Sequence, residues 1–281
     1  MQQSIQTRKF FSVTALSLTG LFAAITVSVL FFILGYILFH GIRALNFGFF
    51  IHLPTPVGEP GGGMANAIVG TVKLLFLASL LGVPIGFFAG VYLAEFGHNR
   101  FGFWVRYATD LLNGVPSIVM GIFAYTLIVL PTRQFSTLAG GVALGIMMIP
   151  IAVRSTEEFL RLVPRSVREA AFALGIHEWK TIFFVVIPAA YRGLLTGILL
   201  DLARVAGETA PLLFTAFNNR VWSRGWMEPT ASLPVMIFTY AIAPYEDWHA
   251  QAWAGALVLM MLVLVVNGGA RLLLPRRRIA V

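Results

Sequence analysis

The sequence predicts an all-α, polytopic membrane protein with six membrane-spanning helices. First, 58% of the 281 residues are hydrophobic, 11% are charged and the mean hydropathy is +0.83, whereas soluble domains have about 45–50% apolar and about 25% charged residues. Second, apolar runs recur at close to the ~20 residues that cross a hydrocarbon core. Third, the Lys and Arg residues behind the net charge of +8 gather at the ends of these runs, which is typical of membrane orientation rather than of nucleic-acid binding.

The first span is expected near 13–39, because no charged residue occurs between Phe10 and Ile42. That stretch is too long for the ~7–15-residue core of a signal peptide. The next loop, with three prolines and the run Gly61-Gly62-Gly63, cannot continue a helix. Because backbone polar groups in lipid must be satisfied within their own segment, the later apolar runs are also expected to be helices, near 65–94, 108–130, 138–153, 187–214 and 252–274.

A further apolar stretch, from Ser232 to Ala243, is bracketed by Pro234 and Pro244 and is too short to span. We expect a short interfacial or re-entrant helix there. With both ends of the chain inside, most Lys and Arg residues fall on the inner side. Because an excess of basic residues faces the cytoplasm, both termini are predicted to be cytoplasmic.

The inner loop at about 154–188 is the most informative segment. Pro164 and Gly175 frame a short helix, and Gly175 can adopt the left-handed conformation needed to turn into a second one. A thin apolar stripe recurs at helical spacing in the first helix, formed by Val167, Ala170 or Ala171, and Leu174. A compact helical knob of this kind suits docking into a partner's groove. The alternative is a surface helix that only caps the bundle.

The same loop carries a family signature. Glu169-Ala170-Ala171 is followed after three residues by Gly175 and after nine more by Val185-x-Ile187-Pro188. This pattern resembles the EAA signature of the permease subunits of binding-protein-dependent ABC importers, with the usual Ile-x-Leu-Pro conservatively changed. In that family the loop forms coupling helices that sit in a cleft of a cytoplasmic ATPase. The resemblance implies that Glu169, Ala170, Ala171 and Gly175 couple this chain to such a partner.

Three ionisable residues, Asp201, Arg204 and Glu208, interrupt the fifth apolar run. Charges at this depth are costly and usually face an aqueous path or a partner. At 100° per residue all three are expected on one face of a continuous helix. The alternative is that the two carboxylates neutralise Arg204 and hold two helices together.

The fifth run is also expected to break. Pro211 has no amide hydrogen, so it should free the carbonyl of Gly207 and create a hinge. Irregular backbone at membrane depth is tolerated where it lines a cavity, although a proline kink used only for packing is the alternative. Asn113 and Ser117 in the third run are candidates for lining such a path or for bonding helices together.

The run from Thr196 to Phe214 closely resembles the phosphate-specific permeases of the PstA type, and the similarity extends from Gly62 to Leu274. It implies the ABC type I importer permease fold in a bacterial cytoplasmic (inner) membrane. It also implies translocation of inorganic phosphate by alternating access, with a sister permease (PstC-like), an ATPase pair (PstB-like) and an external phosphate-binding protein (PstS-like). In that family, arginines matching Arg204 and Arg154 and the glutamate matching Glu208 are associated with translocation. Arg presents a planar fork of donors suited to phosphate oxygens.

No enzymatic activity is expected of the chain itself. None of its lysines follows a glycine, so the phosphate-cradling Gly-Lys-Ser/Thr loop is absent and ATP with Mg²⁺ should bind the partner ATPase. Without cysteine, and with five histidines at no paired ligand spacing, neither a metal site nor another cofactor is expected. A membrane-embedded hydrolase would lack a nucleophile, and a stand-alone channel would leave the inner loop unexplained. The expected division is 1–60 for the first helix and external loop, 61–275 for the permease core and 276–281 for a basic tail.

Overall fold

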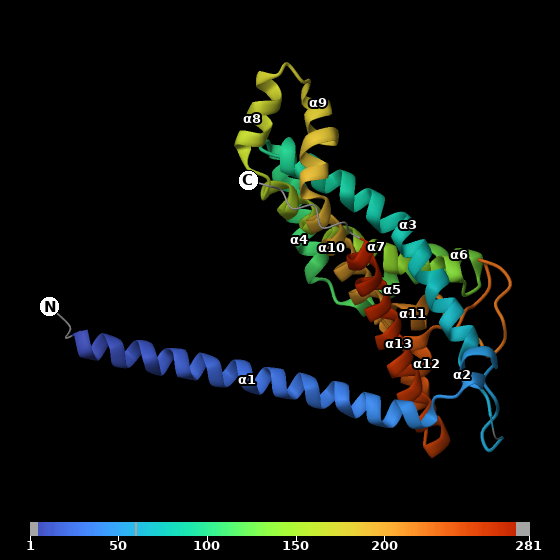
Figure 1. Cartoon of the computed structure of the whole chain (residues 1–281). Helices are drawn as coiled ribbons and strands as arrows, with labels where there is room; N and C mark the ends of the chain where they lie inside the picture. Colours follow the sequence, from blue (N-terminus) through green and yellow to red (C-terminus); the bar gives the residue numbers. More distant parts are fainter. Residues whose placement is uncertain (1–4, 60, 274–281) are drawn as a thin grey trace.

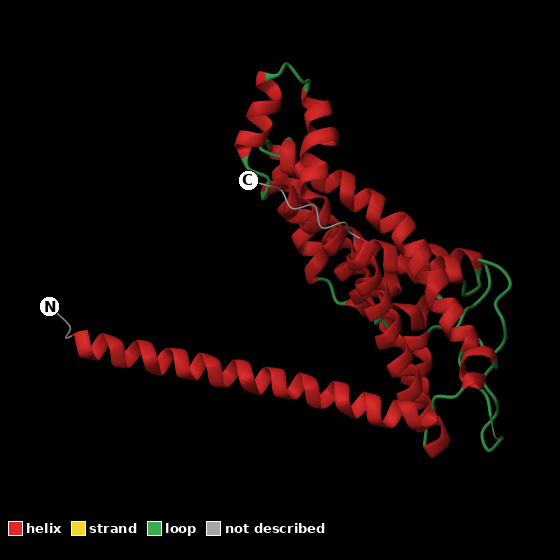
Figure 2. Cartoon of the chain, in the orientation of Figure 1, coloured by secondary structure: helices red, strands yellow, loops and turns green. Residues whose placement is uncertain are grey.

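The computed structural model describes residues 5–59 and 61–273, and every regular element in them is a helix (Figures 1 and 2). The predicted basic tail at 276–281 lies outside the described residues. The long helices are α1 (Ile5–Ala44), α3 (Ala65–Glu95), α4 (Arg100–Gly114), α7 (Thr137–Arg161), α10 (Ile187–Ala206) and α13 (Glu246–Leu273). The short elements are α2 (Phe47–Ile51), α5 (Ser117–Ala124), a π-helical turn (Tyr125–Val129), α6 (Leu130–Thr132), α8 (Arg165–Ala173), α9 (Glu178–Thr181), a second π-helical turn (Ile182–Val186), α11 (Ala210–Thr215) and α12 (Leu233–Ala241).

The predicted spans are present, with corrections to three of them. Among the described residues, five helices are long and apolar enough to cross a membrane, and the total reaches six if α4 and the segment Ser117–Thr132, bent by 102°, count as one span. The third run is therefore not the straight helix expected at 108–130. Pro116 lacks an amide donor and disfavours helical backbone at the preceding Val115, whose φ is −72° and ψ 129°. The short helix expected after Ser232 is confirmed as α12.

The fourth and fifth spans differ from the prediction in their ends. α7 continues to Arg161 rather than stopping near 153, because the charged residues of its last turns are paired with one another and with α4. α10 ends at Ala206 rather than near 214. The fifth span is therefore α9 to α10 followed by a break, not one helix that contains the whole apolar run.

The centre of the bundle is the crossing of α3 and α7, which glycines bring close together. Gly82, Gly86 and Gly90 recur every four residues on one face of α3. A Cβ at Gly82 would lie 2.6 Å from the Cβ of Met148, and one at Gly90 would lie 2.5 Å from that of Thr156. Without a strong hydrophobic force between helices in lipid, such close backbone packing is a main source of association.

Replacing Gly86 with Leu should therefore remove most of the folded subunit from the membrane. The new side chain would collide with Ala152 and with the carbonyl of Ile149, 3.0 Å from an added Cβ, and overpacking of this kind costs about 1–3 kcal/mol or more. The amount of detergent-resistant monomer on gel filtration measures the effect. Gly20→Leu is the matched control, because nothing lies within 4 Å of a Cβ at that position. Equal yields of the two variants would contradict this account of the crossing.

The loop at residues 216–232, here called the distal loop, is tied to the first half of α3. The Asn66 amide donates to the carbonyl of Asn219 at 2.6 Å, and Lys73 Nζ donates to that of Ser223 at 2.8 Å. Within the loop, the backbone amides of Arg224 and Gly225 donate to Glu228, which lowers the pKa of that carboxyl. A polar end of the bundle is thus held in place opposite the α8–α9 hairpin (Figure 1).

Helix α1 leaves the bundle at a wide angle (Figure 1). Its last turns pack on α13, where a Cβ at Gly41 would lie 2.8 Å from the Cβ of Leu257. None of its most apolar 18-residue window is buried, although the mean hydropathy of that window is 2.5. The arm thus presents a predominantly apolar surface to its surroundings.

Candidate functional site

Two helix breaks meet at an exposed face of the bundle. The first is Val115-Pro116 between α4 and α5, and the second is Gly207–Thr209 between α10 and α11. They are held together where α5 crosses α11, because a Cβ at Gly121 would lie only 2.6 Å from the Cα of Pro211. Interrupted helices at membrane depth free backbone groups that can bond to polar cargo.

The predicted hinge at Gly207 and Pro211 is present in a different form. Pro211 does not kink a continuous helix. It lies in the first turn of α11, where its missing amide costs nothing. The backbone amides of Gly207 and Glu208 donate to the carbonyls of Arg204 and Val205 at 3.2 and 3.1 Å, which closes α10. Glu208 therefore lies beyond α10, and the expectation that it shares a helical face with Asp201 and Arg204 is wrong.

A small cavity of about 20 Å³ lies at the junction of the two breaks. It has room for about one water molecule. Its lining comes from α4, α5, α7, α10 and the two breaks: Leu112, Asn113, Val115, Met120, Met147, Ile151, Arg204, Val205 and Glu208. The structure thus brings Arg204 and Glu208 together with Asn113, a polar side chain from the other interrupted span.

Arg204 and Asp201 have opposite surroundings. Arg204 is exposed at the surface of the bundle and, among the described residues, makes no ion pair. The side chain of Asp201 is buried, and neither carboxylate oxygen has a hydrogen-bond partner in the described part of the chain. Asp201 is not among the residues lining the cavity. The described residues therefore do not contain the alternative arrangement, in which the carboxylates of Asp201 and Glu208 pair with Arg204 and hold two helices together.

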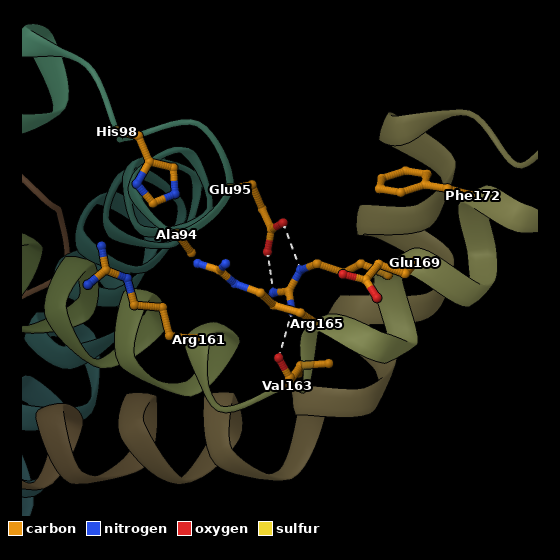
Figure 3. A pocket seen from close by; sticks show the side chains of 9 residues that line it. Ala94, Glu95, His98, Arg161, Val163, Arg165, Glu169 and Phe172 are labelled. Carbon is orange, nitrogen blue, oxygen red and sulfur yellow. Dashed lines mark hydrogen bonds and ion pairs between the residues drawn. The ribbon is translucent and has the colours of Figure 1, made fainter.

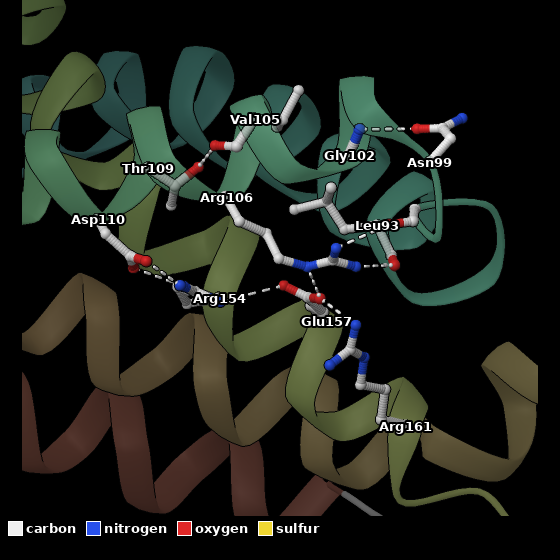
Figure 4. A network of polar contacts seen from close by, with 11 residues as sticks. Leu93, Asn99, Gly102, Val105, Arg106, Thr109, Asp110, Arg154, Glu157 and Arg161 are labelled. Carbon is white, nitrogen blue, oxygen red and sulfur yellow. Dashed lines mark hydrogen bonds and ion pairs between the residues drawn. The ribbon is translucent and has the colours of Figure 1, made fainter.

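Arg154 belongs to a charged network between α4 and α7 (Figure 4). Arg154 Nε donates to Asp110 Oδ1 at 2.9 Å, and its Nη2 pairs with Asp110 Oδ2. The neighbouring Glu157, whose side chain is 2% exposed, accepts from Arg106 Nε at 2.6 Å and pairs with Arg161 Nη2 at 2.7 Å. Arg106 also donates to the carbonyls of Leu93 and Gly97, each at 2.7 Å. This network fastens the end of α3 to α4 and α7.

The α8–α9 hairpin projects from one end of the bundle (Figure 1). The left-handed conformation predicted for Gly175 is confirmed, with φ at +73°. The amides of Gly175 and Ile176 donate to the carbonyls of Phe172 and Ala171, at 2.9 and 3.2 Å, which is the Schellman pattern of a glycine-terminated helix. Beyond it, the tip exposes apolar side chains, including Leu174 at 80% and Trp179 at 56%.

The hairpin is fastened to α3 by an ion pair (Figure 3). Arg168 donates to both carboxylate oxygens of Glu95, at 3.1 and 2.7 Å, and to the carbonyls of Val163 and Leu160. Glu169 and Phe172 line an open pocket of about 770 Å³ beside this pair. Ala171 is buried against the bundle while Ala170 is exposed. The hairpin therefore has one fixed face and one free face.

Residues 82–279 match the model of the family described as the binding-protein-dependent transport system inner membrane component. The chain belongs to this family. It is 43% identical over 242 residues to the phosphate transport system permease protein PstA of Yersinia pestis, covering 85% of this chain and 81% of the relative. It is 47% identical over 241 residues to the protein of the same name from Xylella fastidiosa strain Temecula1, covering 85% and 84%.

Among solved structures, the chain is similar to the inward-facing MetNI methionine ABC transporter. The TM-score is 0.61 at 18% identity, covering 74% of this chain and 94% of the solved one. A likeness at this identity shows the fold, which is that of an ABC type I importer permease. The protein is accordingly a multi-pass membrane permease component, and its interrupted helices are part of a transport subunit.

Several charged residues of this permease were not predicted from the sequence. Glu157 follows Arg154 by three residues and Arg161 follows Glu157 by four, helical spacings that were present as a signal in the fourth run. Arg106 and Asp110 are also four apart, on α4. Their pairing with α7 could not be inferred, because it joins residues 44 and 51 positions apart in the sequence.

Proposed function

We propose that this permease conducts inorganic phosphate inward as one subunit of an ATP-driven importer. The observation that carries the proposal is that Arg204, which makes no ion pair within residues 5–59 and 61–273, lines a cavity where two interrupted helices meet. The guanidinium offers a fork of donors that matches the oxygens of a tetrahedral anion. The names of the relatives, which describe phosphate transport, support the same cargo. Glu208 nearby keeps the site weak, as release requires.

Alternating access in this proposal needs three kinds of partner. A sister permease covers the exposed arginine and the apolar arm α1, because lipid alone does not complete an ion path at Arg204. A separate ATPase pair, binding ATP and Mg²⁺, docks on the free face of the hairpin, which carries Glu169 and Ala170, and on the tip formed at Gly175. Ala171 packs behind this face against the bundle. An external phosphate-binding protein delivers the anion at the distal loop. The hairpin end and both termini then face the cytoplasm, in the inner membrane of a bacterium.

The proposed division of labour follows the predicted boundaries. Residues 1–60 form the arm and its external loop, and residues 61–275 form the conducting core with its coupling segment at about 154–188. The buried carboxylate of Asp201 lies behind Arg204 and acts on the path through the field it exerts, without touching the anion. No step of the proposal requires a cofactor or a metal on this chain.

The test is uptake of radiolabelled phosphate by cells that lack this chain, with and without its restoration. Restoration should return uptake, and removal of the ATPase subunit should abolish it again. Uptake that does not depend on this chain would contradict phosphate as the cargo. Phosphate flux that persists without ATP hydrolysis would favour a channel instead.

A further inference from the structure

Arg154 differs from Arg106 and Arg168, two other paired arginines at the hairpin end of the bundle. Arg106 and Arg168 each combine a carboxylate with two backbone carbonyls, and their partners Glu157 and Glu95 are 2% and 10% exposed. Within the described part of the chain, Arg154 makes hydrogen bonds only to the carboxylates of Asp110 and Glu157. The side chains of Arg154 and Asp110 are 31% and 55% exposed. Among the ion pairs that these three arginines make, this is the pair whose carboxylate is exposed as well as its guanidinium.

Asp110 fills the fork of Arg154 as an oxyanion would. Both carboxylate oxygens bond to the guanidinium, one to Nε and one to Nη2 (Figure 4). Two oxygens of a phosphate present the same spacing and charge to that fork. Because ion pairs open to solvent stabilise little, a free anion can compete for the guanidinium.

The pair lies about one helical turn from residues that line the cavity at the two helix breaks. Asp110 precedes Asn113 by three residues on α4, and Arg154 follows Ile151 by three residues on α7. Three residues of helix correspond to about 4.5 Å along the axis. The fork of Arg154 is thus the next cationic group after Arg204 on the way to the hairpin end.

The surrounding charges make this position favourable for an anion once Asp110 moves away. Arg106, Arg154 and Arg161 surround the single buried carboxylate of Glu157. With Asp110 and Glu158, the other carboxylate whose field reaches Arg154, these groups sum to zero, and without Asp110 they sum to one positive charge. The buried carboxylate of Glu157 holds the guanidinium of Arg154 in place, while the more exposed carboxylate of Asp110 is exchanged for the anion.

From this arrangement we infer that Asp110 is the resident counter-ion of Arg154, which phosphate displaces on its way out and which returns to expel it. Asp110 is thus a positioning residue that acts through Arg154. It keeps the inner binding step weak, so that the anion leaves instead of remaining bound. The inference rests on the proposed function, because it takes phosphate as the cargo.

The experiment uses the complete importer in proteoliposomes, with ATP inside and the binding protein outside. The rate of radiolabelled phosphate uptake is measured while the lumen is loaded with increasing unlabelled phosphate. Asp110→Asn keeps the shape of the side chain but removes its charge. Lumenal phosphate should then inhibit uptake at a roughly fivefold lower concentration than in the wild type, since the fork no longer has a competing carboxylate.

Two further variants separate this role from a structural one. Glu158→Gln removes a carboxylate on the same helix that makes no hydrogen bond to Arg154, so it should keep the wild-type inhibition. In Asp110→Asn combined with Arg154→Gln, the increased sensitivity should disappear, because Asp110 acts through that guanidinium. A purely structural pair would lower complex yield without moving the inhibitory concentration.

The outcomes are distinct. If the wild-type importer takes up no phosphate, the proposed function fails. If it takes up phosphate but Asp110→Asn and the wild type respond equally to lumenal phosphate, only the counter-ion role fails. Increased sensitivity that persists without Arg154 would also overturn it.

Discussion

Replacing Arg204 with Gln should reduce phosphate uptake roughly ten- to hundredfold while the complex still assembles. A charge-assisted hydrogen bond contributes about 1.5–3 kcal/mol, and each ~1.4 kcal/mol corresponds to tenfold. Gln keeps polar reach but loses the fork of donors. Arg204 is exposed and makes no ion pair among the described residues, so its loss leaves no carboxylate stranded. Uptake by cells and the yield of purified complex are measured together.

The control for this prediction neutralises the neighbouring carboxylates. If Arg204 served only to balance Asp201 and Glu208, then adding Asp201→Asn and Glu208→Gln to Arg204→Gln should restore uptake. We expect no rescue, since the anion would still lack its donor. Arg100→Gln, at an exposed arginine that begins α4 and has no proposed role in the path, serves as the matched loss of charge. Full uptake by the triple mutant would refute a substrate role for Arg204.

Substituting Gly175 with Val should uncouple the permease from its ATPase while the subunit still inserts. The backbone there has φ of +73°, and a left-handed conformation costs an L-residue about 1–2 kcal/mol, more for a β-branched one. That strain should distort the turn that places the exposed tip at Leu174. We expect uptake to be lost and less ATPase to copurify with the permease.

A matched glycine distinguishes uncoupling from general strain. Gly61→Val imposes similar strain at φ of +97° in the loop before α3, and no atom lies within 4 Å of a Cβ at either glycine. It should leave ATPase copurification unchanged. Leu174→Asp, which changes the docking surface without backbone strain, should reproduce the loss seen with Gly175→Val. Normal ATPase copurification and normal uptake by both hairpin variants would exclude the docking role.

Much of the fold was predictable because lipid restricts the available structures. An apolar run of sufficient length has to be a helix, and the positions of five long helices and of α12 followed from that rule alone. The turn at Gly175 was predictable because glycine, flanked by a short amphipathic helix, has a known local geometry. These signals are all encoded within about twenty residues of sequence.

The remaining features depend on contacts between distant segments. The break at Pro116 was visible as a proline, but its 102° bend depends on α5 packing against Pro211 of α11. The choice of Asp110 as the partner of Arg154 depends on how α4 lies against α7. Of the candidate site residues, Arg204 and Glu208 meet at one cavity. Asp201, on the same helix as Arg204, does not line the cavity because its side chain is buried.

Helix α3 has a mechanical consequence that its apolar sequence does not suggest. Its 31 residues form a helix about 46 Å long. Glu95 at one end is ion-paired with the hairpin, and Asn66 and Lys73 near the other end are hydrogen-bonded to the distal loop. A displacement of the hairpin can therefore be transmitted along α3 alone to the distal loop at the opposite end of the bundle, without passing through the cavity. Pro84 lies inside α3 and lacks the amide hydrogen for one helical hydrogen bond. The bending stiffness of α3 at Pro84 therefore sets how much of the hairpin's movement reaches the distal loop.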